Sequence, residues 1–252
     1  MLTEDRTDKA ADVVEDARII LRWVFHGRIV PARYSVAVYV PEYFKPDDES
    51  VRELLRHHGA VDLVTTAPDG LWATMLPMIY VEPEGSDETG EHGLLRGHFA
   101  RKNDHWKQPV LGEAMAIVRG PDAYITPSWY ETKREHGRVV PTWNYITAHV
   151  YGELTVHDDP EWVERNVRAL TGKHEAARDP RWAVDDAPEA YVDGQLRAIV
   201  GVELRISRIE AKFKLSQNRS AEDMEGVVAG LGAEDRDDMA SAVQVELAKS
   251  KP

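Results

Sequence analysis

The chain has 252 residues and a mass of 28.4 kDa, with 31 Lys and Arg against 44 Asp and Glu, so its formal net charge is −13 at pH 7. It contains no cysteine, which excludes disulfides, thiolate catalysis and metal or iron–sulfur sites held by cysteine. The negative charge disfavours tight direct binding to DNA, because contacts from Lys and Arg to phosphate supply most of the affinity for a duplex.

Length and composition predict one large soluble domain with appendages. A chain of this length can bury a substantial core, and its 42% hydrophobic and 30% charged residues are ordinary for a globular protein. No apolar run is long enough to span a membrane. The N-terminus is charged from its fourth residue, unlike a secretory signal. We therefore expect a cytoplasmic protein.

The first 38 residues differ from the rest of the chain. Apolar residues recur at helical spacing from Val13 to Val24, which predicts an amphipathic helix in an N-terminal extension. From Tyr39 onward the pattern predicts a different organisation, in which short strands come first and helices follow late.

Asp47 and Asp48 can cap a first helix that runs to about His58. Strands are predicted over residues 61–67, 71–82, 94–99, 113–120, 123–125, 142–157 and 200–210, with a turn at residues 68–70. Asn103 can cap a short helix, and longer helices are predicted over about 159–174, over about 187–199 and after Ser220. These elements describe an α+β protein built around a mostly antiparallel β-barrel with peripheral helices.

The segment from Tyr124 to Gly152 is the richest in candidate functional groups. Its loop and flanking strands carry Ser128, Trp129, Tyr130, Lys133, Arg138, Trp143 and Asn144. Rings can stack on a planar ligand, an amide can bind its edge, and cations can neutralise a phosphate. The segment therefore favours a flat, polar-edged, anionic ligand, although core packing by Trp143 and solvation of Arg138 remain alternatives.

A second candidate region is the most basic stretch of the chain. From Ser207 to Arg219 it carries four cations, Arg208, Lys212, Lys214 and Arg219, against Glu210. Such a local reversal in an acidic protein marks a candidate anion site. The alternative is a surface strand end paired with the acidic tail.

Two further groups are less specific. Thr65 and Thr74 face each other across the turn at residues 68–70, and threonine is also simply a good strand residue. Arg96 and His98 flank a glycine on a strand, where they could pair with phosphate or a ring edge, but a strand histidine often only packs. No spacing of the scattered histidines indicates a metal site, and no glycine-rich nucleotide loop or nucleophile motif is present.

Five blocks occur in order along the chain: VPEYF (40–44), RGH (96–98), PSWY (127–130), GRVVPTWNY (137–145) and KFKLSQNR (212–219). Together they resemble the PaiB-like family of FMN-binding negative transcriptional regulators, over roughly residues 39–231. The resemblance implies an FMN-binding split β-barrel that forms a homodimer, with FMN in a cleft where the two subunits meet. The acidic charge and the lack of a DNA-reading motif argue against a regulator that binds DNA unaided.

The resemblance and the residue chemistry together give a set of expected FMN-binding residues, with no catalytic residue assigned. These are Thr65, Thr74, Arg96, His98, Asn103, Lys133, Arg138, Trp143, Asn144, Lys214 and Gln217. Neighbouring strand residues face opposite sides. We expect Asn144 to face the flavin, because a buried amide needs polar partners, and Trp143 to face the barrel core or the partner subunit.

One departure from the family pattern lies at Met75, in MLP, where relatives usually have histidine in HLP. An alternative function is a flavin-dependent oxidoreductase resembling pyridoxamine phosphate oxidase. A haem-binding enzyme ranks last, because haem normally needs an axial ligand such as histidine and Met75 replaces the best candidate.

The expected organisation has three parts. Residues 1–38 form the N-terminal extension, residues 39–219 the split β-barrel domain and residues 220–252 a helical tail. The family pattern starts near Tyr39 and Val38 stands where relatives have their initiator, so the extension is either an additional helix or the product of an over-long start assignment.

Overall fold

The computed structural model of the chain describes residues 24–25, 28–29, 38–85 and 89–250. It divides into two compact units, residues 1–39 and residues 40–252. In the first unit, β1 (Val24–Phe25) pairs antiparallel with β2 (Arg28–Ile29). The helix expected before Val24 lies outside the described residues, apart from Val24 itself, which begins a strand.

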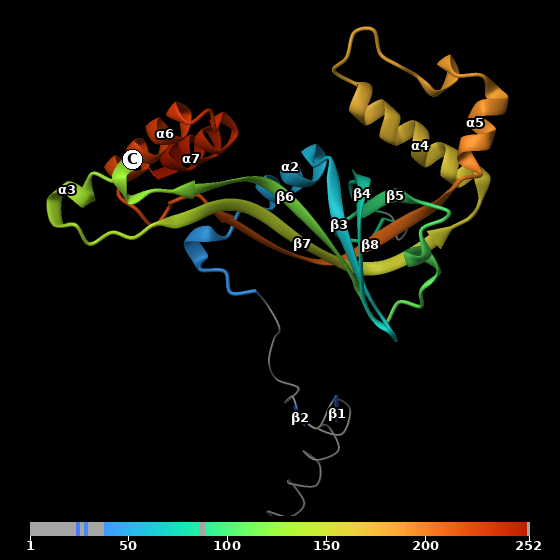
Figure 1. The fold of residues 1–252 in the computed structure, drawn as a ribbon, viewed down its shortest axis with the longest axis horizontal. Helices are drawn as coiled ribbons and strands as arrows, with labels where there is room; N and C mark the ends of the chain where they lie inside the picture. The colour runs from blue at the N-terminus through green and yellow to red at the C-terminus, as the bar shows by residue number, and fades with distance from the viewer. Residues whose placement is uncertain (1–23, 26–27, 30–37, 86–88, 251–252) are drawn as a thin grey trace, which may run out of the picture. The chain divides into compact units, whose positions relative to one another are not determined.

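A closed ring of six antiparallel strands forms the centre of the second unit (Figure 1). The strands are β3 (Ala60–Ala67), β4 (Gly70–Val81), β5 (Leu94–Ala100), β6 (Ala114–Ile125), β7 (Thr142–His157) and β8 (Ile199–Lys214). Their spatial order is β3-β4-β5-β8-β7-β6, and β6 pairs back with β3. The expected α+β split-barrel fold is confirmed.

Alternation along the strands builds the barrel core. In β3, Val61 and Leu63 are buried inside the barrel, whereas Asp62 and Val64, which alternate with them, are only partly buried. The helix α2 (Asp48–His57) adds the fully buried Leu55 to the same core. As the sequence predicts, Asp47 caps this helix, since its carboxylate accepts a hydrogen bond from Ser50 N at 2.7 Å.

The strands β6, β7 and β8 continue beyond the part of the barrel that pairs with β3 and β5. β6 pairs with β3 only over residues 115–118 but follows β7 to Ile125. This extension packs on α6 (Ala221–Ala233) and α7 (Asp237–Ser250) through a second core, in which Ile125, Leu215 and Met224 are buried. A short helix, α3 (Thr132–His136), which the sequence did not predict, lies in the loop between β6 and β7.

The helix α4 (Pro160–Glu175) packs on β4, β5 and β8, away from α6 and α7, and α5 (Glu189–Leu196) follows it (Figure 1). Trp162 of α4 occupies the space beside Gly201, where a Cβ atom would lie 2.3 Å from the indole. Short 3-10 helices are η1 (Glu42–Phe44), η2 (Asp104–Lys107), η3 (Pro127–Trp129) and η4 (Val184–Asp186). Among the described residues, no helix has the length and apolar character needed to span a membrane.

Candidate functional site

The beginning of β7 presents an aromatic and a basic row on the outer face of the sheet. Trp143 is 49% exposed, whereas its neighbour Asn144 is fully buried. Tyr145 is directly opposite Lys214 of β8, and Trp143 is opposite Tyr124 of β6. Because residues in register share a face, these side chains form one surface. We call Tyr124, Trp143, Tyr145, Lys212 and Lys214 the β7–β8 face.

The two lysines of this face contact different groups: Lys214 contacts neutral oxygens and Lys212 an aromatic ring. Lys214 Nζ donates to the hydroxyl of Thr142 and, at 3.0 Å, to the carbonyl oxygen of Trp143. Partial burial lowers the pKa of Lys214, and the nearby cations Lys212 and Arg219 lower it further. Lys212 Nζ lies 5.8 Å from the ring centroid of Tyr145 and is within cation–π range of it.

Trp143 is fixed although half of it is exposed. Its indole Nε1 donates to Asp122 Oδ1 at 2.9 Å, and its ring centroid is 6.2 Å from that of Tyr124. A partly exposed ring with a fixed orientation is suited to contact a planar ligand, and a partly desolvated cation with neutral partners, such as Lys214, is suited to bind a phosphate. The donor set of the β7–β8 face therefore fits FMN.

Asn144 and Gln217 are engaged within the protein. Asn144 Nδ2 donates to the hydroxyl of Ser216 at 3.0 Å inside the sheet. The Gln217 side chain accepts from Leu215 N and donates to the carbonyl oxygen of Phe213, both at 2.7 Å. Asn144 thus faces the interior, whereas Trp143 lies on the open face. The barrel-core alternative for Trp143 is therefore wrong, and its contact with a partner subunit stays a prediction.

Lys133 and Arg138 lie on the β6–β7 loop, residues 126–141, which leads into the β7–β8 face. Lys133 Nζ donates to the Ser128 hydroxyl at 3.1 Å, and both Lys133 and Arg138 are exposed. Both side chains are therefore accessible to an anion. No hydrogen bond among the described residues links either of them to Lys214.

Thr65, Thr74 and Asn103 converge on a histidine that the sequence analysis missed. The buried ring of His105 lies 2.8 Å from the hydroxyls of both Thr65 and Thr74, through Nε2 and Nδ1 respectively. Asn103 caps η2 by accepting from His105 N, as the sequence predicts. Burial lowers the pKa of His105, which favours the neutral ring. The two hydroxyls expected at the flavin thus bind this imidazole, and their contact with FMN stays a prediction.

Arg96 and His98 lie under α4. Arg96 Nε is 2.6 Å from Glu203 Oε2. Burial lowers the pKa of His98, whose buried Nδ1 has no hydrogen-bond partner among the described residues. Beside them His157 stacks on Trp162, with ring centroids 4.1 Å apart. Nine of the eleven expected residues therefore lie in the β7–β8 face with its loop, in the His105 cluster or at the α4 contact, and the other two, Asn144 and Gln217, are engaged within the protein.

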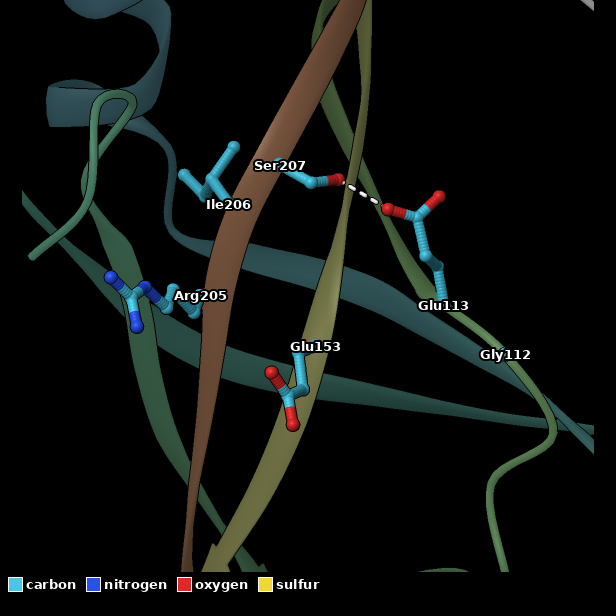
Figure 2. A pocket seen from close by; sticks show the side chains of 6 residues that line it. All are labelled: Gly112, Glu113, Glu153, Arg205, Ile206 and Ser207. Atoms are coloured by element: carbon cyan, nitrogen blue, oxygen red, sulfur yellow. Dashed lines mark hydrogen bonds between the residues drawn. The ribbon is translucent and has the colours of Figure 1, made fainter.

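A separate pocket opens where a bulge interrupts the pairing of β7 with β8 (Figure 2). It is lined by Gly112, Glu113, Glu153, Arg205, Ile206 and Ser207. The Ser207 hydroxyl donates to Glu113, as the dashed line in Figure 2 shows. Two carboxylates against one guanidinium repel a phosphate, and none of the expected residues lines it, so this pocket does not fit FMN. No group of three or more metal-ligating side chains occurs in the described ranges.

Comparison with known proteins identifies the family of the chain. Residues 38–208 match the family model described as "Putative FMN-binding domain", and the chain belongs to this family of FMN-binding split-barrel proteins. The resemblance inferred from the five sequence blocks is thereby confirmed, and FMN is the cofactor.

Curated relatives agree over most of the chain. The protease synthase and sporulation protein PAI 2 of Bacillus subtilis is 32% identical over 200 residues, which cover 79% of this chain and 91% of that protein. An uncharacterized protein of Emericella nidulans is 30% identical over 211 residues, covering 71% and 84% respectively. Among solved structures, an FAD- and heme-binding protein from Mycobacterium smegmatis shares the fold, with a TM-score of 0.50, 14% identity and coverage of 73% and 80%.

Proposed function

We propose that this protein is a homodimer that binds FMN on the β7–β8 face, in a cleft completed by the second subunit. The observation that carries the proposal is Lys214, a partly desolvated cation held by neutral oxygens beside two other cations. A phosphate there gains a charge-assisted hydrogen bond and relieves the repulsion among the cations. Trp143 and Tyr145 supply rings for the isoalloxazine.

The dimer contact that we propose is the outer face of the barrel next to this site. Met75 of β4 lies in one cross-strand row with Asp62, Ile117 and His149. Met75 is 70% exposed and Leu71, on the same face of β4, is 76% exposed. Exposed apolar side chains on a continuous sheet face are typical of a subunit interface.

FMN, when bound, supplies electron-transfer chemistry that the protein positions and tunes. Lys214 binds the phosphate, the rings of Trp143 and Tyr145 orient the flavin, and a second subunit on this face excludes water. We propose a cytoplasmic, flavin-dependent regulatory role, as the resemblance to the PaiB-like regulators implies, with a partner supplying any DNA contact. A flavin-dependent oxidoreductase would use the same site.

The test is FMN binding and mass in solution. The purified protein should show flavin absorption bands, take up FMN stoichiometrically and elute as a dimer. Lys214→Met should weaken FMN binding about tenfold to a hundredfold, while the exposed control Lys102→Met should not change it. Unaltered FMN affinity in Lys214→Met would refute the site. Oxidation of NAD(P)H by the FMN-loaded protein would favour the oxidoreductase, and a Soret band would indicate haem.

A further inference from the structure

The C-terminal helices α6 and α7 lie beyond residues 38–208, which the family model matches, yet α6 contacts the β6–β7 loop and α7 packs on β6. Asp223 of α6 is 1% exposed, and its carboxylate accepts two hydrogen bonds from Thr132 of the loop. Thr132 N lies 2.9 Å from Oδ1 and the Thr132 hydroxyl 2.7 Å from Oδ2. A buried carboxylate with two donors fixes the segment to which it binds.

The same loop is seated against two glycines of α6. A Cβ atom at Gly226 would lie 1.9 Å from the carbonyl oxygen of Trp129, and one at Gly230 would lie 2.3 Å from the Trp129 indole. Any larger residue would displace the loop, so α6 is shaped for close approach at this point. Arg219, just before α6, stacks over the neighbouring Tyr130 ring at 4.6 Å.

A second connection leads from the helices to the aromatic part of the β7–β8 face. Arg236, between α6 and α7, donates to the carbonyl oxygen of Asp122 at the bulge in β6. The carboxylate of Asp122 in turn accepts from the Trp143 indole at 2.9 Å. The helices therefore contact the site on two sides, at the segment that carries Lys133 and at the residue that orients Trp143.

We infer that the α6–α7 pair contributes to FMN binding by positioning residues of the site. Asp223 positions the β6–β7 loop, and Arg236 positions Trp143 through Asp122. The inference rests on the proposed FMN site. Stability of the helix pair comes from its apolar contacts, because Val227, Leu231 and Val243 are fully buried. The polar contacts of Asp223 are made with the β6–β7 loop, and those of Arg236 with the β6 bulge. These contacts fix the positions of the two segments.

The decisive variants are Thr132→Val, which keeps the shape but removes the hydroxyl donor, and Thr132→Ser, which keeps the donor. Thr132→Val should raise the FMN dissociation constant about fivefold, change the visible circular dichroism of the bound flavin and speed tryptic cleavage after Lys133 and Arg134. Thr132→Ser should restore all three. Arg236→Gln should raise the dissociation constant and alter the flavin spectrum without faster cleavage of the loop.

Val243→Ala is the matched control, since it weakens the packing of α7 and leaves both polar connections intact. It should lower the melting temperature but hold the FMN dissociation constant within about twofold at 25 °C. The inference fails if wild type binds FMN and Lys214→Met does not, while Thr132→Val binds like wild type. It also fails if Val243→Ala weakens binding as much as Thr132→Val. A wild-type protein without FMN affinity overturns the proposed function itself.

Discussion

The ammonium of Lys214 lies 3.0 Å from the carbonyl oxygen of Trp143. The first residues of β7 therefore both expose the Trp143 ring and bind the Lys214 cation. Thr142 supplies the second oxygen contact. Neither oxygen carries a charge, and burial together with Lys212 and Arg219 lowers the pKa of Lys214. A bound phosphate would reverse that shift, because a nearby anion favours the protonated lysine.

FMN binding should therefore weaken at alkaline pH. The phosphate is fully ionised well above its second pKa of about 6, so the change reports the lysine. Affinity should be constant near pH 7.5 and fall as pH rises toward the lowered pKa of Lys214, earlier than for an ordinary lysine with a pKa of about 10.4. Fluorescence titrations with FMN between pH 7.5 and 10 measure the dissociation constant at each pH. Lys214→Arg should remove this dependence, and an identical alkaline decline in that variant would contradict the assignment.

The exposed side chains of Met75 and Leu71 on β4 should contribute to association of the two subunits and little to the folding of each. Met75→Lys and Leu71→Glu place charges on the proposed subunit interface and should convert the dimer into a folded monomer. Their exposure of 70% and 76% predicts little change in the stability of the subunit itself. Tyr191→Lys is the control, because Tyr191 is 60% exposed on α5. Light scattering after gel filtration gives the mass, and dimers in both interface variants would refute this contact.

Asn144 should contribute to stability through its bond to Ser216. Asn144→Ala leaves the buried Ser216 hydroxyl without its partner and should lower the free energy of unfolding by about 1–3 kcal/mol. Ser216 has a φ of 68°, so Ser216→Ala also keeps a strained backbone. Urea denaturation of both single variants and the double variant measures their coupling. Additive losses would show that the two side chains act independently.

The strands were predictable from sequence because alternation and turns are local signals. The 142–157 strand was predicted with the bounds of β7, and the turn at 68–70 separates β3 from β4. β6 was predicted as two pieces, 113–120 and 123–125, whereas in the structure it is one strand with a bulge between Arg119 and Asp122. β8 extends to Lys214, four residues past its predicted end, because pairing with β7 overrides local pattern.

The site was harder to predict because its partners are distant in sequence. Alternation correctly places Trp143 and Asn144 on opposite faces, but nothing local says which face is open. His105 meets Thr65 across 40 residues, and its sequence setting shows only a helix cap. Likewise Asp223 reaches Thr132 across 91 residues. The contact of His105 with Thr65 depends on closure of the barrel, and that of Asp223 with Thr132 on the packing of α6 against the loop. A single sequence reveals neither of these tertiary arrangements.

Binding to random duplex DNA should be weak, and the protein alone should form no sequence-selective complex at physiological salt. The reason is the net charge of −13, which repels the phosphate backbone. Fluorescence anisotropy with labelled duplexes at two salt concentrations is a direct measurement, with and without FMN. A nanomolar, sequence-selective complex of the purified protein would contradict the need for a partner.

The buried His58 should make the fold sensitive to acid. Burial, and then the charge of Lys173, lower the pKa of His58 from 6.5 to about 4. His58 is 4% exposed, and its Nδ1 lies 2.5 Å from the carbonyl oxygen of Leu55. Lys173 Nζ donates to the carbonyl oxygen of His58 at 2.7 Å. Protonation would thus place a second cation beside Lys173 with little solvent to screen it.

Between pH 6.5 and 4 the unfolded chain binds a proton at this histidine and the folded chain does not. The free energy of unfolding should therefore fall as pH decreases through that window, by on the order of 3 kcal/mol from this group. Urea denaturation at pH 7.5, 6 and 4.5 should show a smaller decline for His58→Gln than for wild type. Some decline remains, because burial also lowers the pKa of His98, His105 and His157. A wild-type slope in His58→Gln would contradict this assignment and show that acid sensitivity resides in the other histidines.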